Sequence, residues 1–224
     1  MILYIIATPI GNLEEITLRA VRILNQVDLI LAEDTRITKK LLERYNIRKP
    51  LLSYHQHSKL NRLDLIVEEL EQGKSLALVS DAGTPGISDP GTELISYLLS
   101  RSDLDSLKII PISGSSALTA ALSISGFDAS NFIFLGFPPH KKGRQKFFDE
   151  LSKSKYTVVF YESPYRIIKA LESLALLLPE RKIMVARELT KQFETIYRGT
   201  ASEILDGLKK IQIRGEFVIV ISGK

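Results

Sequence analysis

The chain alternates short, wholly apolar runs with longer segments in which apolar residues recur every three or four positions. Wholly apolar runs predict strands buried on both faces, and the longer segments predict amphipathic helices. Strands are predicted at 2–6, 28–32, 76–79, 108–112, 132–137, 157–161, 182–186 and 216–221. Helices are predicted at 14–26, 61–72, 165–178 and from about Thr92 onward. Because strands and helices alternate, we expect an α/β fold built on mostly parallel sheet.

A change of character near residues 111–116, Pro-Ile-Ser-Gly-Ser-Ser, predicts a domain boundary. A strand ends there and a turn of small residues follows. The charge balance also changes sign, from 13 Lys and Arg against 15 Asp and Glu over residues 1–112 to 17 against 11 over residues 113–224. We therefore expect two α/β domains, 1–112 and 113–224, with a ligand site in the cleft between them.

Residues 80–91, Ser-Asp-Ala-Gly-Thr-Pro-Gly-Ile-Ser-Asp-Pro-Gly, predict a ligand-binding loop at the end of a buried strand. Glycine allows the backbone to approach a ligand closely, and proline fixes the shape of the loop in advance. Polar clusters also follow other predicted strands, at 8–13, 33–36, 113–116, 161–166 and 187–191. The carboxyl ends of parallel strands meet at one sheet edge, where such folds bind ligands. A surface turn is the alternative for the loop, and helix caps or surface ion pairs are the alternative for the clusters.

Composition excludes several kinds of chemistry. With no cysteine, the chain has no disulfide, no thiolate nucleophile and no cysteine-ligated metal. Neither of the common glycine motifs that bind nucleotide phosphates is present, which disfavours a phosphate-bearing cofactor. His55 and His57 have only one further histidine elsewhere, so we predict no metal site. No apolar run reaches the ~20 residues that span a bilayer, and the N-terminus begins as a strand, so we expect a cytoplasmic protein without membrane contact.

The densest positive charge lies in residues 140–146, His-Lys-Lys-Gly-Arg-Gln-Lys, of a chain with a pI near 9.1. Such a run is typical either of a solvated loop or of a contact with a polyanion such as RNA. The candidate RNA contacts in this run are Lys141, Lys142, Arg144 and Lys146, and Arg36 in the first half is a fifth.

Six motifs in this order resemble those of the bacterial 16S rRNA cytidine 2′-O-ribose methyltransferases, a branch of the tetrapyrrole methylase superfamily. They are Thr8–Leu13 (TPIGNL), Ala32–Arg36 (AEDTR), Ser80–Gly91, Phe160–Arg166 (FYESPYR), Ala186–Lys191 (ARELTK) and Gly215–Val220 (GEFVIV). The resemblance implies a class III methyltransferase fold of two α/β lobes, with mostly parallel sheet in the first and mixed sheet in the second. It also implies S-adenosylmethionine as cofactor, a homodimer, and methylation of the ribose 2′-hydroxyl of a decoding-region cytidine in 16S rRNA or in the assembled small ribosomal subunit.

Carried over by position, the resemblance also implies the cofactor contacts. These are Pro9, Ile10, Gly83, Thr84, Ile87, Ser88, Ser115, Ser116, Tyr161, Leu189 and the backbone near Phe217. The superfamily loop is typically Gly-Asp-Pro, whereas Gly83-Thr84-Pro85 is the form of the rRNA branch and argues against a porphyrin substrate.

Methyl transfer to a hydroxyl needs positioning and a base that shares the hydroxyl proton. Asp34, Glu162 and Glu188 are the candidate catalytic carboxylates. Arg36, Arg166 and Arg187 lie near them in the sequence, so a structural ion pair is the alternative, and we favour it for at least two of the three.

Two other functions remain open: a sibling enzyme that methylates a tetrapyrrole or a protein, and a non-catalytic RNA-binding protein with the same fold. The basic second half and Gly-Thr-Pro favour rRNA over the first alternative. The intact cofactor motifs favour an enzyme over the second.

Overall fold

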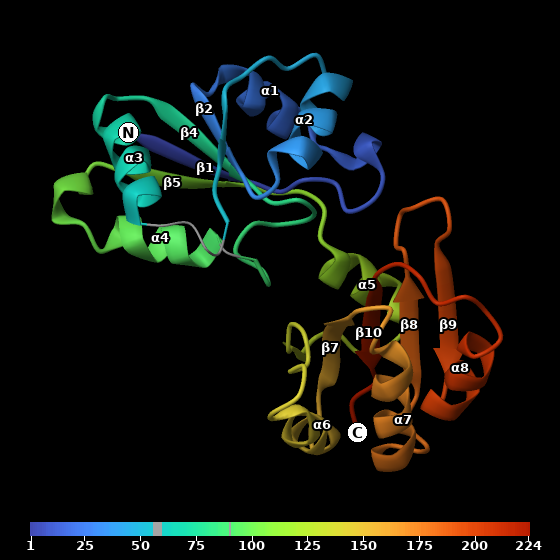
Figure 1. The fold of residues 1–224 in the computed structure, drawn as a ribbon. Helices are drawn as coiled ribbons and strands as arrows, with labels where there is room; N and C mark the ends of the chain where they lie inside the picture. The colour runs from blue at the N-terminus through green and yellow to red at the C-terminus, as the bar shows by residue number, and fades with distance from the viewer. Residues whose placement is uncertain (56–59, 90) are drawn as a thin grey trace. The chain divides into compact units, whose positions relative to one another are not determined.

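The computed structural model describes residues 1–55, 60–89 and 91–224, which form two compact units, Met1–Ser116 and Ala117–Lys224. Each unit has its own five-stranded sheet covered by helices (Figure 1). The turn at 113–116 belongs to the first unit because it packs there. A Cβ on Gly114 would lie 3.0 Å from the Cβ of Ala7, and Thr84 donates a hydrogen bond to the carbonyl of Ser115.

The first unit contains a parallel sheet in the order β3-β2-β4-β1-β5. Its strands are β1 (Ile2–Ile6), β2 (Leu29–Ala32), β3 (Leu51–Ser53), β4 (Ser75–Val79) and β5 (Lys108–Ile112). Val79 at the end of β4 is level with Ile6 and Ala32, and Ile6 is level with Ile112. The carboxyl ends of these four strands therefore meet at one edge, as their shared direction predicts.

Helices cover both faces of this sheet (Figure 1). The helices α1 (Leu18–Gln26) and α2 (Thr35–Arg44) pack on one face, and α3 (Leu60–Glu71) and α4 (Gly91–Leu99) pack on the other. Thr17 and Asp34 cap α1 and α2 by accepting hydrogen bonds from the first-turn backbone. Two short 3₁₀ turns, η1 (Leu13–Glu15) and η2 (Ser102–Leu104), complete the unit.

The second unit has a mixed sheet in the order β6-β7-β10-β8-β9. Its strands are β6 (Phe132–Phe134), β7 (Thr157–Glu162), β8 (Ile183–Arg187), β9 (Thr195–Gly199) and β10 (Phe217–Ile221). β6 and β7 are parallel, and β10 runs antiparallel to both β7 and β8. These two sheets confirm the expected fold class.

Three helices, α6 (Arg144–Ser152), α7 (Ile167–Leu177) and α8 (Ala201–Leu208), bury a core with β7, β8 and β10. Its largest side chains are Phe148, Phe160 and Phe217, each 1% exposed or less. The remaining helix, α5 (Ala117–Ser125), packs against β10 and β7.

The sequence pattern missed two strands and overestimated the burial of two others. β3 and β9 lack a long apolar run, and each is an edge strand with a neighbour on one side only. β5 and β6 were predicted to be buried on both faces, yet Lys108, Pro111 and Phe132 are exposed. Both strands also lie at sheet edges, where the covering layers end.

Candidate functional site

The glycine-rich loop after β4 is fastened to the end of β1. Thr8 and Gly83 exchange two backbone hydrogen bonds, with N–O distances of 2.9 and 3.0 Å. The buried Thr8 hydroxyl also donates to the carbonyl of Ser80, at 3.0 Å. Gly83 has φ +85° and Gly86 has φ +86°, a region that residues with a Cβ rarely occupy. Hydrogen bonds to Thr8 thus fix the shape of the start of this loop.

The far end of the same loop is organised by Asp89. Its Oδ1 accepts hydrogen bonds from the backbone N–H of Gly86, at 2.6 Å, and of Gly91, at 2.8 Å. The Thr92 hydroxyl donates to the Gly86 carbonyl, and Ser88 adopts φ +62°. These contacts preorganise the turn, which lowers the entropic cost of binding a ligand.

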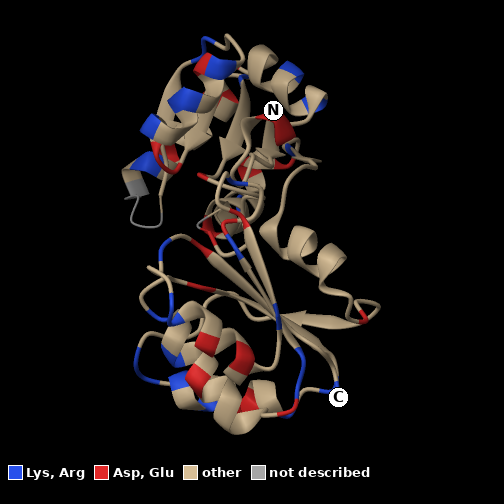
Figure 2. Ribbon diagram, turned by 90° about the vertical axis from the view of Figure 1, so that its right-hand side faces the viewer, with Lys and Arg blue, Asp and Glu red and all other residues tan. Residues whose placement is uncertain are grey.

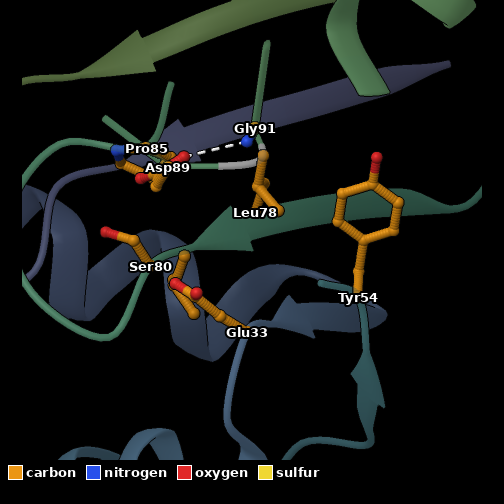
Figure 3. A pocket seen from close by; sticks show the side chains of 8 residues that line it. Glu33, Tyr54, Leu78, Ser80, Pro85, Asp89 and Gly91 are labelled. Carbon is orange, nitrogen blue, oxygen red and sulfur yellow. Dashed lines mark hydrogen bonds between the residues drawn. The ribbon is translucent and has the colours of Figure 1, made fainter. Parts of the chain in front are cut away.

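A small pocket lies beside this loop at the carboxyl edge of the sheet (Figure 3). It is lined by Glu33, Tyr54, Leu78, Val79, Ser80, Pro85, Asp89 and Gly91. Burial, together with the negative charges of Asp81 and Asp89, raises the pKa of the Glu33 carboxyl. Burial also raises the pKa of Asp81. A pocket carboxyl that resists ionisation, as Glu33 does here, is typical of functional sites.

Neither Glu33 nor Tyr54 is among the site residues that the sequence predicts, which include Asp34 next to Glu33. The signal for Glu33 was its position directly after β2, at the edge where the loops meet. Tyr54 follows β3, and because that strand was not predicted, nothing directed attention to the residue behind it.

Asp34 forms an ion pair with its neighbour Arg36. The nitrogen–oxygen distance is 2.5 Å, and Asp34 also accepts the backbone N–H of Arg36 as the cap of α2. Hydrogen bonds from the Arg36 side chain and backbone lower the pKa of Asp34 to about 2. The backbone N–H of Asp34 donates to Asp81, which ties this turn to the glycine-rich loop.

Glu162, at the end of β7, is the most deeply buried charged residue among those described, at 1% exposure. Its two oxygens face Arg144 and Arg166, each at 2.9 Å, and one also accepts the N–H of Ser163. Arg166 also donates a hydrogen bond to the carbonyl of Pro138, and Arg144 donates one to the carbonyl of Pro139. Glu162 therefore binds the loop after β6 to the end of β7.

Tyr161, next to Glu162, carries the aromatic part of this strand end. Its ring makes edge contacts with Phe134 and Phe137, at centroid distances of 5.0 and 5.4 Å. Burial raises the pKa of its hydroxyl, and this effect outweighs a hydrogen bond with the Leu118 backbone, which lowers that pKa.

The loop after β8 is strained. Glu188 and Thr190 have φ values of +52° and +65°, and the second is costly for a β-branched residue. Burial opposes ionisation of Glu188, but hydrogen bonds from Lys191 and from the N–H of Glu216 prevail and lower its pKa. The partner of Glu188 is thus Lys191, and not Arg187 as expected. Arg187 donates instead to the carbonyl of Arg214.

The predicted cofactor contacts fall at two sheet edges, one in each unit. The first unit brings together Pro9, Ile10, Gly83, Thr84, Ile87, Ser88, Ser115 and Ser116. In the second, Phe217 is level with Glu162 and Arg187, so Tyr161, Leu189 and Phe217 share an edge. The Phe217 side chain lies in the core, which leaves only its backbone for a ligand.

Of the four cations predicted to lie in a basic loop, Lys141 and Lys142 precede α6, whereas Arg144 and Lys146 lie in its first turn. They also differ in availability. Lys141 and Lys142 are exposed, and the Lys146 side chain is 79% exposed with Glu150 at 3.7 Å. Arg144 was expected to meet RNA, but its side chain is 16% exposed, pairs with Glu162 and lies over the Phe148 ring. The positive charge of Arg144 is therefore engaged within the protein, and the predicted RNA contact is replaced by the ion pair with Glu162.

Two buried side-chain oxygens at these edges, Glu15 Oε2 and Thr190 Oγ1, have no hydrogen-bond partner among the described residues. A ligand with amino and hydroxyl groups fits such positions, because buried polar atoms are normally satisfied. In residues 1–55, 60–89 and 91–224, no group of three or more metal-ligating side chains is placed to hold an ion. His57 lies outside these residues. No helix in the same ranges is both long and apolar enough to cross a membrane.

The chain is similar to proteins of known structure over nearly its whole length. A cobalt precorrin-4 methyltransferase matches with a TM-score of 0.73 at 18% identity, covering 99% of this chain and 94% of the other. Uroporphyrin-III C-methyl transferase from Thermus thermophilus, complexed with S-adenyl homocysteine, matches with a TM-score of 0.68 at 17% identity, covering 99% and 97%. At these identities the likeness establishes the fold.

Sequence similarity is closer and confirms the resemblance drawn from the motifs. The family model Tetrapyrrole (Corrin/Porphyrin) Methylases matches residues 2–205. Ribosomal RNA small subunit methyltransferase I of Thermotoga maritima is 45% identical over 222 residues, 99% of this chain and 98% of its own length. The protein of that name from Bacillus subtilis is 46% identical over 223 residues, 99% of this chain and 75% of its own length. The chain therefore belongs to the tetrapyrrole methylase family, in the branch of the ribosomal RNA small subunit methyltransferases I.

Proposed function

We propose that this protein transfers a methyl group from S-adenosylmethionine to the ribose 2′-hydroxyl of a decoding-region cytidine in 16S rRNA. The observation that carries the proposal is the 45% identity, across almost the entire length of both chains, with a relative named as a small subunit rRNA methyltransferase. The basic loop and the Gly-Thr-Pro sequence support rRNA over a tetrapyrrole or protein substrate. The proposal includes a cytoplasmic homodimer, as the family resemblance implies.

The cofactor contacts in this proposal are the residues already named at the two sheet edges. Gly83 and Gly86 leave room for close backbone approach, while Thr84, Ser88, Ser115 and Ser116 offer polar contacts. Glu15 and Thr190 supply acceptors that the protein itself leaves unsatisfied. When bound, the cofactor supplies an electrophilic methyl group. The contribution of the protein is to hold the ribose oxygen in line with it.

The choice of general base changes once the charges are compared. Asp34, Glu162 and Glu188 each face a cation within 2.9 Å, so their carboxylate oxygens are already engaged in ion pairs. Glu33 has a raised pKa and lines the pocket beside the glycine-rich loop, so it is closer to the pKa at which a base works well. We therefore prefer Glu33 to the three carboxylates first considered.

Two measurements test the proposal. Calorimetry in the presence of EDTA should detect binding of S-adenosylmethionine and of its demethylated product, and the absence of both would exclude a methyltransferase. Small ribosomal subunits that lack the modification should then accept tritiated methyl, and digestion of the RNA should locate the label on a cytidine ribose. Label on a base or on a ribosomal protein would contradict the substrate assignment, and analytical ultracentrifugation tests the dimer.

A further inference from the structure

The exposed face of α2 carries a row of cations, although residues 1–112 together hold more Asp and Glu than Lys and Arg. Arg36, Lys39, Lys40 and Arg44 are all exposed, with side-chain exposures of 87% for Arg36 and 70% for Lys39. At 100° per residue they fall within one arc of the helix, and the only acidic residue of α2, Glu43, falls among them. We call these four residues the α2 row. In the unit that carries the N-terminus, Figure 2 shows Lys and Arg recurring along the helices.

Half of these cations have no acidic partner among the residues that the structure describes. Arg36 pairs with Asp34 at 2.5 Å and Lys39 approaches Glu43 at 3.8 Å. Lys40 and Arg44 form no ion pair within the described residues. Exposed pairs such as these are weak and screened, so the row presents a net positive face.

The row adds little net stability to the helix that carries it. Arg36 and Lys40, and again Lys40 and Arg44, are four positions apart, where like charges repel. Arg36 lies in the first turn, where the helix dipole favours negative groups, whereas Arg44 lies in the last turn, where it favours cations, so these two effects offset each other. The weak pair of Lys39 with Glu43 is the one favourable contact of the row within the helix. The opposite face, Thr38, Leu41 and Leu42, already anchors α2 to the sheet. Helix stability alone therefore does not account for this row of cations.

The position of the row points to a second role. Its first member adjoins Asp34, whose N–H binds Asp81 in the loop that carries the glycine-rich turn. From there the row extends about 12 Å along the axis to Arg44, and Arg36, Lys40 and Arg44 follow one another about 6 Å apart along it. A regular row of cations that starts at a ligand-binding edge suits the phosphates of one nucleic acid strand.

We propose that the α2 row is a second RNA-binding surface, separate from the basic loop, that holds rRNA backbone phosphates leading to the site. This inference rests on the proposed function. It adds that substrate affinity depends on cations in the first unit, although that unit is acidic overall.

The test compares two variants with equal loss of charge. Lys39→Ala/Lys40→Ala/Arg44→Ala removes most of the row, and alanine preserves the helix. Lys153→Ala/Lys209→Ala/Lys210→Ala removes three exposed lysines from the ends of α6 and α8. Both are assayed with tritiated S-adenosylmethionine on unmodified small ribosomal subunits across a range of salt concentrations, with cofactor affinity measured by calorimetry.

We expect the α2 variant to raise KM for the subunit at unchanged kcat and unchanged cofactor affinity. The slope of log affinity against log salt should become about 2–3 units shallower if each of the three cations contacts a phosphate. The control should match the wild type. Equal behaviour of the two variants, whether both weaken or neither does, would overturn the inference, whereas failure of the wild-type protein to transfer methyl would overturn the proposed function instead.

Discussion

The carboxylate of Glu162 and the guanidinium of Arg144 meet at 2.9 Å, where the first is 1% exposed and the second is largely covered. The pair joins the end of β7, which carries Tyr161, to the first residue of α6, which follows the basic loop. A group first considered as a catalytic base thus lies in a structural bond beside the site. Its removal should affect the fold before it affects chemistry.

Glu162→Gln should lower the free energy of unfolding by about 3–5 kcal/mol, because two guanidinium groups then face a neutral amide in a buried position. Urea unfolding measures this loss. Arg144→Met and the double variant complete a cycle, and the two single effects should fail to add by about 0.5–3 kcal/mol. Additive effects would mean that the two side chains do not interact.

Gly83→Ala should lower stability by roughly 1–2 kcal/mol, because alanine is strained at φ +85°. It should also weaken binding of S-adenosylmethionine. Gly73→Ala is a matched control, since Gly73 has φ +81° with no atom within 4 Å of an added Cβ, and it follows α3, away from the carboxyl edge. Equal stability loss with weaker cofactor binding only for Gly83→Ala is the expected result in calorimetry. Equal cofactor affinity in both would place the cofactor elsewhere.

Glu33→Gln should raise stability at neutral pH while it lowers activity. The pKa of Glu33 is raised in the fold above its ordinary value of 4.5, so the folded state binds the proton more tightly and loses stability as pH rises through the folded pKa. Glutamine removes this loss, and the stability gain should vanish below about pH 4.5, where both states are protonated. Unfolding across pH measures this.

As a general base, Glu33 should contribute roughly 10²–10⁴-fold to kcat. Single-turnover methyl transfer by Glu33→Gln measures this contribution, with cofactor affinity as the control. A stabilised variant with full activity would show that Glu33 is not the base.

Lys141→Ala/Lys142→Ala/Lys146→Ala should weaken RNA binding and make its salt slope shallower by about 2–3 units, with unchanged cofactor affinity. Arg144 is left intact because its loss would disturb Glu162. Binding of a decoding-region RNA fragment at several salt concentrations provides the measurement. An unchanged slope would mean that these three lysines are ordinary solvated surface residues.

The buried strands were well predicted from the sequence, because a strand that is buried on both faces needs apolar residues at every position. β1 and β7 were located to within one residue at each end. The edge strand β3 was not predicted, because its residues are only half-buried and do not form a long apolar run. The glycine-rich loop was recognisable because positive φ demands glycine at 83 and 86. The sequence indicated Arg166 as a partner of Glu162, which the structure confirms. It did not indicate the second partner, Arg144, which only the fold brings near, or the choice of Lys191 over Arg187 as the partner of Glu188.

The central position of β1 has a consequence for synthesis. Ile2 pairs with Ser75 on one side and with Lys108 on the other, so the first strand translated has no complete set of neighbours until residue 112 has emerged. In the second unit, β10 inserts last between β7 and β8, which were made some thirty to sixty residues earlier. A nascent chain of this kind carries bare apolar strands for most of its translation. Its need for chaperones should therefore be set by topology, independently of how stable the finished protein is.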